Sequence, residues 1–230
     1  MKKNILFMTM LALAGVSLTS CSDEDTAGKS RITTYAVLEM NGSAYETVQL
    51  GTTYNDPGCV ATLGSEDVTS QIETIGTVNT NTLGYYKLSY QVVNSDGFPA
   101  SASRLVAVVD KNNFASTYFA ESQYGSRHYF NAPIEIEDNG DGTFTIEDLA
   151  GGFYSYGRYP GYDAYGYDFF LESTLKLNAD NTIEIVECNG DNWYWGESMT
   201  LTSGSYDPET GKVTMVLDFS GAPMYVTLTK

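Results

Sequence analysis

The sequence predicts an all-β protein, and three observations support that prediction. Short runs of β-branched and aromatic residues, such as residues 33–37 and 86–92, alternate with clusters of glycine, asparagine, aspartate and proline. Turn sequences such as Ser-Asp-Gly at 95–97 separate neighbouring runs in the manner of hairpins. Long helical periodicity is absent from the sequence. We therefore expect two β domains: a β-sandwich over residues 32–110 and an antiparallel β barrel or sandwich over residues 111–230.

The first residues are typical of a bacterial lipoprotein signal peptide. Two lysines precede an apolar run over residues 5–16, and Leu-Thr-Ser-Cys follows at 18–21. A membrane-spanning helix needs roughly 20 apolar residues, so this shorter run disfavours a transmembrane anchor. The tetrapeptide resembles a lipobox, which favours lipidation of Cys21 over an ordinary secretory signal with an incidental cysteine. We predict a signal peptide over residues 1–20 and a lipid-anchored mature protein.

Residues 21–31 are polar and without periodicity, which predicts a flexible acidic tether. Ser-Asp-Glu-Asp at 22–25 resembles the export sequence that places lipoproteins on the surface of Gram-negative glycan-degrading gut bacteria. An ordinary solvated linker is the alternative. The expected location is the outer membrane, exposed at the cell surface, with the lipid anchor as the only membrane contact.

The strong negative charge of the chain excludes some partners. The sequence has 12 Lys and Arg against 29 Asp and Glu, a formal net charge of −17. Nucleic acid and anionic lipid headgroups repel such a chain, so nucleic-acid binding is not expected. Acidity suits a soluble surface protein that meets neutral sugars or cations.

The first domain contains turn and strand sequences in a recognisable order. Asp-Pro-Gly at 56–58 favours a turn, because proline restricts φ and glycine tolerates positive φ. Tyr86, Leu88 and Tyr90 share one face of a strand, and the turn at 95–97 joins that strand to the next. The ordered motifs are Gly51, Tyr54, 56–58 (Asp-Pro-Gly), 68–69 (Val-Thr), 76–80 (Gly-Thr-Val-Asn-Thr), 83–86 (Leu-Gly-Tyr-Tyr), Tyr90, 94–97 (Asn-Ser-Asp-Gly) and 104–106 (Arg-Leu-Val).

These motifs resemble the bacterial Ig-like domain that occurs as a repeat in surface proteins and beside pesticidal crystal toxins. The resemblance covers nearly the whole first domain. It implies an Ig-like β-sandwich, which most often acts as a spacer or adhesion module. Fold alone does not assign a function.

The second domain shows well-marked turns between short strands. Strands are predicted at 129–137, 143–149, 168–177, 182–188, 198–206, 212–219 and 223–229. The segment 111–122 is expected to be a short helix or an irregular link. Regular hairpins of this kind indicate an antiparallel meander, either a small barrel or a two-sheet sandwich.

Three motifs of this half are similar to the C-terminal domain of lipoproteins encoded beside starch-utilisation-like uptake systems. They are Asn-Gly-Asp-Gly-Thr-Phe at 139–144, Gly-Gly-Phe-Tyr at 151–154, and the turn from Tyr206-Asp207 to Thr210-Gly211. The resemblance implies no activity. It implies a genomic setting, namely glycan capture and import.

Residues 151–170 hold the densest group of aromatic side chains, on a backbone rich in glycine. A second group, Trp-Tyr-Trp at 193–195, follows on another turn. Sugars offer apolar C–H faces on which rings stack and hydroxyl edges that polar side chains bind, and Arg158, Asp163 and Asp168 lie among the rings of the first group to do so. We predict that the stacking residues are Tyr156, Tyr159, Tyr162, Tyr165, Trp193 and Trp195, with Asp163 and Asp168 as hydrogen-bond acceptors. A protein interface and simple core packing are the alternatives.

Metal and enzyme chemistry find little support in the sequence. His128 is the only histidine, which excludes histidine-rich zinc sites, and it is expected to be an ordinary strand residue. Asp138, Asn139 and Asp141 do not follow the EF-hand spacing and are predicted to form a turn. No serine-hydrolase elbow or phosphate-binding loop occurs. We predict no cofactor and no metal.

Cys59 and Cys188 are expected to be two buried, inert thiols in separate domains.

The predicted function is non-catalytic binding of a polysaccharide or oligosaccharide in a polysaccharide-uptake system. The alternative is an accessory subunit that docks on an outer-membrane transporter complex, where the same rings would be interface anchors. A glycosidase is a third hypothesis, because that chemistry needs only two carboxylates about 5 to 9 Å apart.

Overall fold

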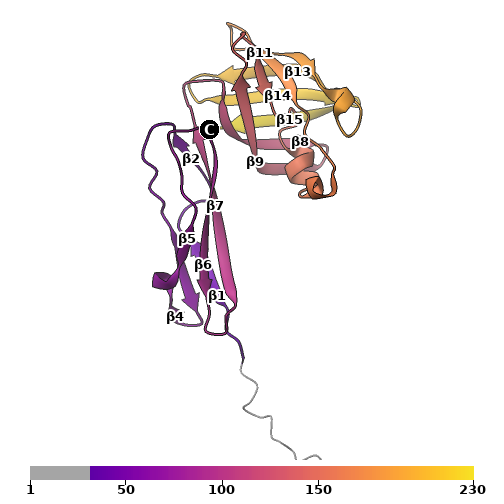
Figure 1. Cartoon of the computed structure of the whole chain (residues 1–230). Coiled ribbons are helices and arrows are strands. Elements are labelled where there is room, and N and C mark those ends of the chain that lie inside the picture. Colours follow the sequence, from indigo (N-terminus) through magenta and orange to yellow (C-terminus); the bar gives the residue numbers. More distant parts are fainter. Residues whose placement is uncertain (1–31) are drawn as a thin grey trace, which may run out of the picture. The chain divides into compact units, whose positions relative to one another are not determined.

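The computed structural model describes residues 32–230, and Figure 1 labels many of their strands. The predicted signal peptide, Cys21 and the tether lie outside the described residues. Within residues 32–230, no helix is both long and apolar enough to cross a membrane. Apart from a few short helical turns, all the regular secondary structure of the described residues is strand, which confirms the all-β prediction.

The described residues 36–109 form two sheets. One sheet has the order β1-β3-β4 and the other the order β2-β7-β6-β5, with β2 and β7 parallel and the other pairs antiparallel. The strands are β1 Ala36–Met40, β2 Tyr45–Gln49, β3 Cys59–Leu63, β4 Glu66–Asp67, β5 Glu73–Ile75, β6 Gly84–Val93 and β7 Pro99–Val109. A short 3-10 helix, η1, spans Thr69–Gln71. This arrangement confirms the predicted Ig-like sandwich.

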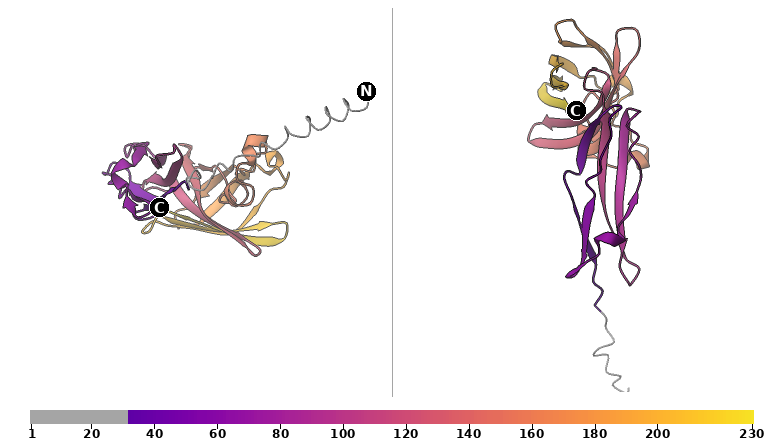
Figure 2. Two further views of the ribbon diagram at one scale, coloured as in Figure 1. Left: turned by 90° about the horizontal axis from the view of Figure 1, so that it is seen from below. Right: turned by 90° about the vertical axis from the view of Figure 1, so that its left-hand side faces the viewer.

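The longest hairpin of this region is formed by β6 and β7, which run side by side in the right-hand view of Figure 2. Leu88, Tyr90 and Val92 are buried while the residues between them are not, so one face of β6 contributes to the core, as the period of two predicts. Cys59 is buried against this core and has a free thiol, and burial raises the pKa of the Cys59 thiol.

Arg104 lies on β7 with its side chain fully buried. Its Nε donates to the Ser43 carbonyl at 2.9 Å, and its Nη1 donates to Asp56 Oδ1 at 2.7 Å. Its Nη2 donates to the Asn41 carbonyl. The Tyr90 hydroxyl also donates to Asp56 Oδ1, at 2.6 Å. Arg104 therefore fixes segment 41–56 against β7 through charge-assisted bonds.

The described residues 116–229 form one antiparallel sheet of eight strands in the order β12-β11-β10-β9-β8-β15-β14-β13. The strands are β8 Ser116–Tyr124, β9 Arg127–Asp138, β10 Phe144–Ile146, β11 Ser173–Leu177, β12 Ile183–Cys188, β13 Thr200–Asp207, β14 Lys212–Phe219 and β15 Ala222–Thr229. A bridge between Thr182 and Ser205 and a bond from the Tyr206 amide to the Asn181 carbonyl join the two edges. The sheet is therefore a nearly closed barrel, which decides between the two predicted architectures.

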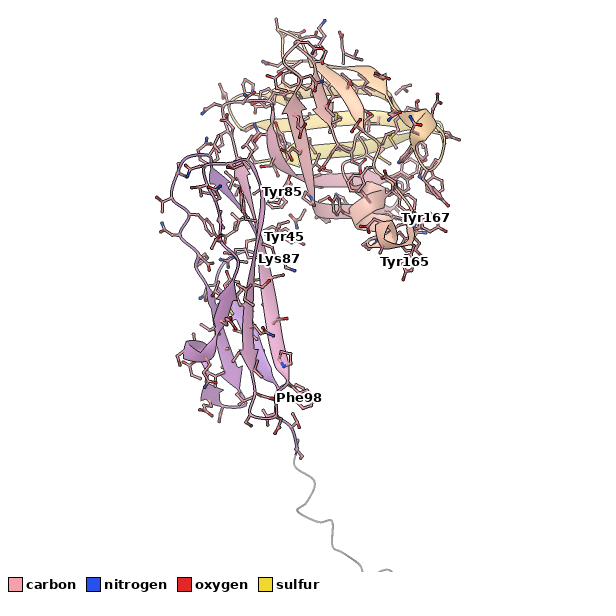
Figure 3. The ribbon with its side chains drawn as sticks, viewed as in Figure 1. Tyr45, Tyr85, Lys87, Phe98, Tyr165 and Tyr167 are labelled. Atoms are coloured by element: carbon pink, nitrogen blue, oxygen red, sulfur yellow. The ribbon has the colours of Figure 1, made fainter. Side chains whose placement is uncertain are left out.

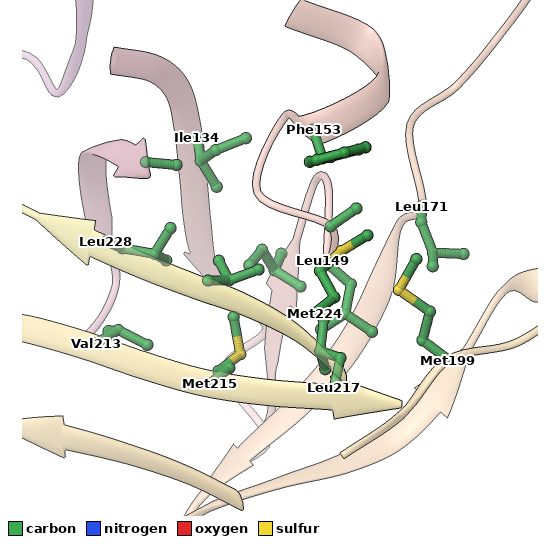
Figure 4. Close-up of a cluster of buried hydrophobic side chains, with 14 of the residues drawn as sticks. Ile134, Leu149, Phe153, Leu171, Met199, Val213, Met215, Leu217, Met224 and Leu228 are labelled. Atoms are coloured by element: carbon green, nitrogen blue, oxygen red, sulfur yellow. The ribbon is translucent and has the colours of Figure 1, made fainter. Parts of the chain in front are cut away.

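The inside of this sheet is filled by apolar side chains (Figure 4). Ile134, Leu175, Val213, Met215 and Leu228 are almost completely buried there. Alternate residues of β14 and β15 face this core, which is the pattern expected of a small barrel filled by side chains.

Strand β8 corrects the expectation of a helix or irregular link at 111–122. Residues 116–120 of β8 are all buried, so the alternation that reveals a half-buried strand is absent from them. Polar side chains are buried here too: the Thr117 hydroxyl donates to the Val108 carbonyl at 2.6 Å. The strand lies in the middle of the sheet, between β9 and β15.

Smaller corrections concern strand ends and one thiol. The strand predicted at 168–177 begins only at residue 173, and the one predicted at 143–149 covers 144–146. Both shortened strands border the loop that contains the aromatic residues. Cys188 is half-buried rather than buried.

Candidate functional site

The aromatic loop, residues 150–170, leaves the sheet after β10 and returns before β11. It contains one π-helical segment, η2 Phe153–Arg158, and one 3-10 turn, η3 Tyr162–Tyr165. Figure 3 labels Tyr165 and Tyr167, which lie at the outer end of this loop. Sequence reasoning anticipated glycine-rich loop backbone, whereas the structure forms short helical turns with specific packing.

A buried carboxylate organises both ends of the aromatic loop. Asp148 is completely buried. Its Oδ1 accepts hydrogen bonds from the amides of Ala150 at 3.0 Å and Leu171 at 3.4 Å. Its Oδ2 accepts from the Gly152 amide at 3.1 Å and the Ser155 hydroxyl at 2.8 Å. Burial raises the pKa of Asp148 to about 6, although these four bonds act to lower it.

Two glycines let the aromatic loop pack closely on β9. Gly152 has a φ of 75°, and a Cβ added there would lie 2.4 Å from the Cβ of Ala132. A Cβ on Gly157 would lie 2.4 Å from the Tyr129 ring. Only glycine lets the backbone at these two positions approach β9 so closely, and this close packing positions the η2 segment and its rings.

A second segment, residues 189–198, brings the Trp-Tyr-Trp group to the same place. It begins with the 3-10 turn η4 Gly190–Asn192. The Trp193 indole nitrogen donates to the Phe169 carbonyl at 2.9 Å, which ties this segment to the aromatic loop. The two aromatic groups that the sequence places apart are therefore neighbours in space.

Phe169 is the centre of the resulting aromatic cluster. Its ring lies within 6.4 Å, centroid to centroid, of Tyr159, Tyr162, Tyr167, Tyr194 and Trp195. Tyr159 stacks on it at 4.8 Å with an interplanar angle of 22°. The Trp195 ring also lies 5.6 Å from the Tyr154 ring. Together these contacts make one continuous patch of rings.

The predicted site residues fall into different environments. Tyr156, Tyr162 and Trp195 are 41%, 44% and 37% exposed, and Tyr165 is 78% exposed. Tyr159 is half-buried, and Asp163 and Asp168 are exposed. Trp193 is only 4% exposed, so its indole packs in the core and is not open to a ligand.

Two cavities border the cluster. The first, of about 160 Å³, is lined by Tyr156, Tyr159, Asp163, Tyr167, Phe169 and Phe170, among others. The second, of about 400 Å³, is lined by Tyr124, Arg127, Tyr154, Arg158, Tyr159, Trp195 and Glu197, among others. Tyr159 lines both cavities, so a ligand in either one would contact the cluster.

A third cavity, of about 390 Å³, shares Phe170 with the first, and its other lining residues are polar: Glu147, Asp168, Glu172, Asn189 and Asn192. The pKa of Glu147 is raised to about 7, mainly because the side chain is buried. A hydrogen bond from the Glu135 amide acts to lower this pKa, whereas the nearby carboxylates of Glu135 and Asp148 act to raise it. Near neutral pH a carboxyl group of this kind is part protonated, so it can donate as well as accept a hydrogen bond.

Some residues of the site were absent from the sequence prediction. Phe169, Tyr167 and Tyr194 belong to the cluster, and their position inside the two aromatic runs was the available clue. Arg127 was also absent; it lines a cavity with Arg158, which lies in the first aromatic run and was considered for hydroxyl binding, and nothing in the sequence connects these two arginines, because one begins β9 and the other ends η2. Glu147 follows β10 and carried no recognisable motif.

The other motifs behave as turns and strands. The Asp138 and Asp141 carboxylates cap the turn between β9 and β10 by accepting bonds from the amides of Gly140 and Thr143. His128 lies in β9, and its Nε2 is 2.6 Å from Glu121 Oε1. Over residues 32–230, no three His, Cys, Asp or Glu side chains are placed to hold a metal ion.

Comparisons with known families identify both halves of the chain. A family model described as a "-like, C-terminal domain" matches residues 109–230, which is more than half of the chain. The chain therefore belongs to the family that this C-terminal domain defines. A second model, described as "Bacterial surface protein, Ig-like domain", matches residues 38–108. Both matches agree with the resemblances recognised in the sequence.

Among solved structures, the chain is similar to the lipoprotein BT2262 from Bacteroides thetaiotaomicron. The two are 27% identical with a TM-score of 0.55, over 85% of this chain and 100% of that chain. A structure of the CBM51-2 module with GlcNAc and INT domains from Clostridium perfringens ZmpB gives 13% identity and a TM-score of 0.29, over 78% of this chain and 29% of that chain. That likeness is too weak to support an inference. A comparison with curated proteins found no match.

Proposed function

We propose that this protein is a cell-surface lipoprotein that binds glycan without catalysis, through the aromatic cluster around Phe169. The observation that carries the proposal is the meeting of the two aromatic segments, which leaves half-exposed rings beside cavities. Such a surface offers flat apolar faces for pyranose rings, and Asp163 lines the first cavity as a hydrogen-bond acceptor.

The lipid anchor and the location are part of the proposal. Leu-Thr-Ser-Cys at 18–21 and the acidic residues that follow support a protein attached through Cys21 to the outer membrane and exposed at the cell surface. Similarity to a Bacteroides lipoprotein supports the same assignment. Such a protein would hold polysaccharide close to an uptake system.

Affinity gel electrophoresis of residues 32–230 against a panel of soluble plant and host polysaccharides tests this function. We expect retardation by at least one glycan, and at least tenfold weaker binding in Tyr156→Ala and Trp195→Ala, because each deletes an exposed ring beside a different cavity. Tyr225→Ala is the matched control: its side chain is 50% exposed on β15, outside the cluster.

The melting temperature of each variant separates loss of binding from loss of folding. If the folded wild-type protein migrates at the same rate with and without each glycan of the panel in the gel, the glycan-binding function is wrong.

Docking on an outer-membrane transporter complex is the second candidate function. Tyr165 and Tyr194 favour it, because they are 78% and 49% exposed and line none of the cavities described above. Protruding tyrosines are common anchors of protein interfaces. Tyr165→Ala would then weaken capture of the transporter while leaving glycan retardation unchanged.

A further inference from the structure

The cavity of about 400 Å³ between β8, β9, η2 and the segment 189–198 contains two guanidinium groups. Arg127 is the first residue of β9, after the turn from β8, and Arg158 is the last residue of η2. Both line this cavity together with the rings of Tyr159 and Trp195. The whole sequence has only 12 basic residues against 29 acidic ones, so two arginines in one cavity make a local exception to its charge.

Neither guanidinium is neutralised by the described part of the protein. The described salt bridges of the chain involve Arg104 and His128, and no described carboxylate lies within 4.0 Å of Arg127 or Arg158. Glu197 lines the same cavity, but its Oε2 accepts a hydrogen bond from the Ser220 hydroxyl at 2.8 Å. The donors of both arginines are therefore available to a ligand.

The positive charges of Arg127 and Arg158 both influence the hydroxyl of Tyr154, which lines the same cavity. Burial raises the pKa of the Tyr154 hydroxyl to about 12, and the charges of Arg127 and Arg158 both act to lower it. The Arg158 guanidinium carbon lies 5.4 Å from the centroid of the Tyr159 ring, so this group is held beside an aromatic face. Tyr159 also lines this cavity and is the ring that it shares with the neighbouring cavity.

We propose that this cavity binds the carboxylate of an acidic sugar, such as a uronic acid unit within a glycan. Guanidinium groups recognise carboxylates through paired, charge-assisted hydrogen bonds, and the partly exposed ring of Trp195 provides the apolar face for the pyranose. Because the chain as a whole is strongly acidic, an acidic sugar would bind at this arginine-lined cavity rather than on the surrounding surface. The inference rests on the proposed function and names its ligand class.

The test compares polygalacturonate oligomers with the same oligomers fully methyl-esterified, by calorimetric titration of residues 32–230. We expect the ester to bind at least tenfold more weakly, because it keeps the sugar rings and removes the negative charge. Arg127→Gln and Arg158→Gln should each weaken binding of the acidic oligomer at least tenfold and that of neutral glycans by less than threefold. Lys176→Gln on β11 is the charge-matched control and should change neither.

The alternative results contradict the inference in distinguishable ways. Equal binding of the acidic oligomer and its methyl ester would show that the arginines do not bind a carboxylate. Undiminished binding of the acidic oligomer by both arginine variants would show the same. Equally tight, arginine-dependent binding of poly-glutamate would assign the cavity to an acidic peptide instead. Binding of neutral glycans alone would overturn this inference and leave the proposed function standing, whereas no binding of any glycan would overturn both.

Discussion

Replacing Asp148 with alanine is expected to lower the free energy of unfolding by about 3–5 kcal/mol and to abolish glycan binding. The change leaves the amides of Ala150, Gly152 and Leu171 without their acceptor in a buried place. These amides lie at both ends of the aromatic loop, so the loss should release the rings as well as reduce stability. Urea unfolding measures the first effect, and near-ultraviolet circular dichroism of the aromatic residues measures the second.

Two further variants make the Asp148 prediction specific. Asp148→Asn keeps the shape of the side chain but replaces one acceptor oxygen with a donor, so an intermediate loss of about 1–3 kcal/mol is expected. Asp191→Ala removes an exposed carboxylate from the neighbouring segment and should have almost no effect on stability. A loss below about 1 kcal/mol in Asp148→Ala would show that this carboxylate does not organise the loop.

Replacing Arg104 with alanine should destabilise the Ig-like sandwich by about 3–5 kcal/mol, because it leaves Asp56 without its cation and two backbone carbonyls without a donor. Arg104→Lys should recover only part of the loss, since an ammonium group cannot reproduce the planar guanidinium fork. Urea unfolding followed by far-ultraviolet circular dichroism measures both variants.

Lys87→Ala, an exposed basic residue on the adjacent strand β6, is the control for loss of charge and should change stability little. Arg104→Ala should also leave the aromatic cluster intact, because no ring of the cluster contacts this network. If a folded Arg104→Ala variant no longer bound glycan, Arg104 would have a role in binding as well as in stability, contrary to this prediction.

The predictable parts of the fold are turns made of turn-favouring residues and strands with one buried and one exposed face. Turns at 95–97 and 138–142 are formed by residues that favour them, and the strands beside them alternate because one face is buried. Strand β8 was missed because residues 116–120 are buried on both faces, which removes the alternation. The closure of the barrel was also undetermined, since it depends on a long-range bridge between Thr182 and Ser205.

The candidate site was predictable in composition but not in geometry. The sequence indicates which runs are aromatic, whereas the exposure of each ring depends on tertiary packing. Trp193 and Trp195 are two residues apart in the same run, yet one is buried against Phe169 and the other is partly exposed. The η2 segment depends on Asp148 and on close contacts of Gly152 and Gly157 with β9, and no local pattern reveals these.

Glycan bound on the aromatic cluster would cover the Trp195 ring, so the accessibility of Trp195 to a quencher reports where glycan binds. The sequence has two tryptophans, and Trp193 is only 4% exposed while Trp195 is 37% exposed, so acrylamide should quench mainly Trp195. We expect saturating glycan to protect this fluorescence, and Trp195→Phe to remove the protected component. A glycan that binds the protein while Trp195 stays as accessible to acrylamide as before would place the binding site away from the aromatic cluster.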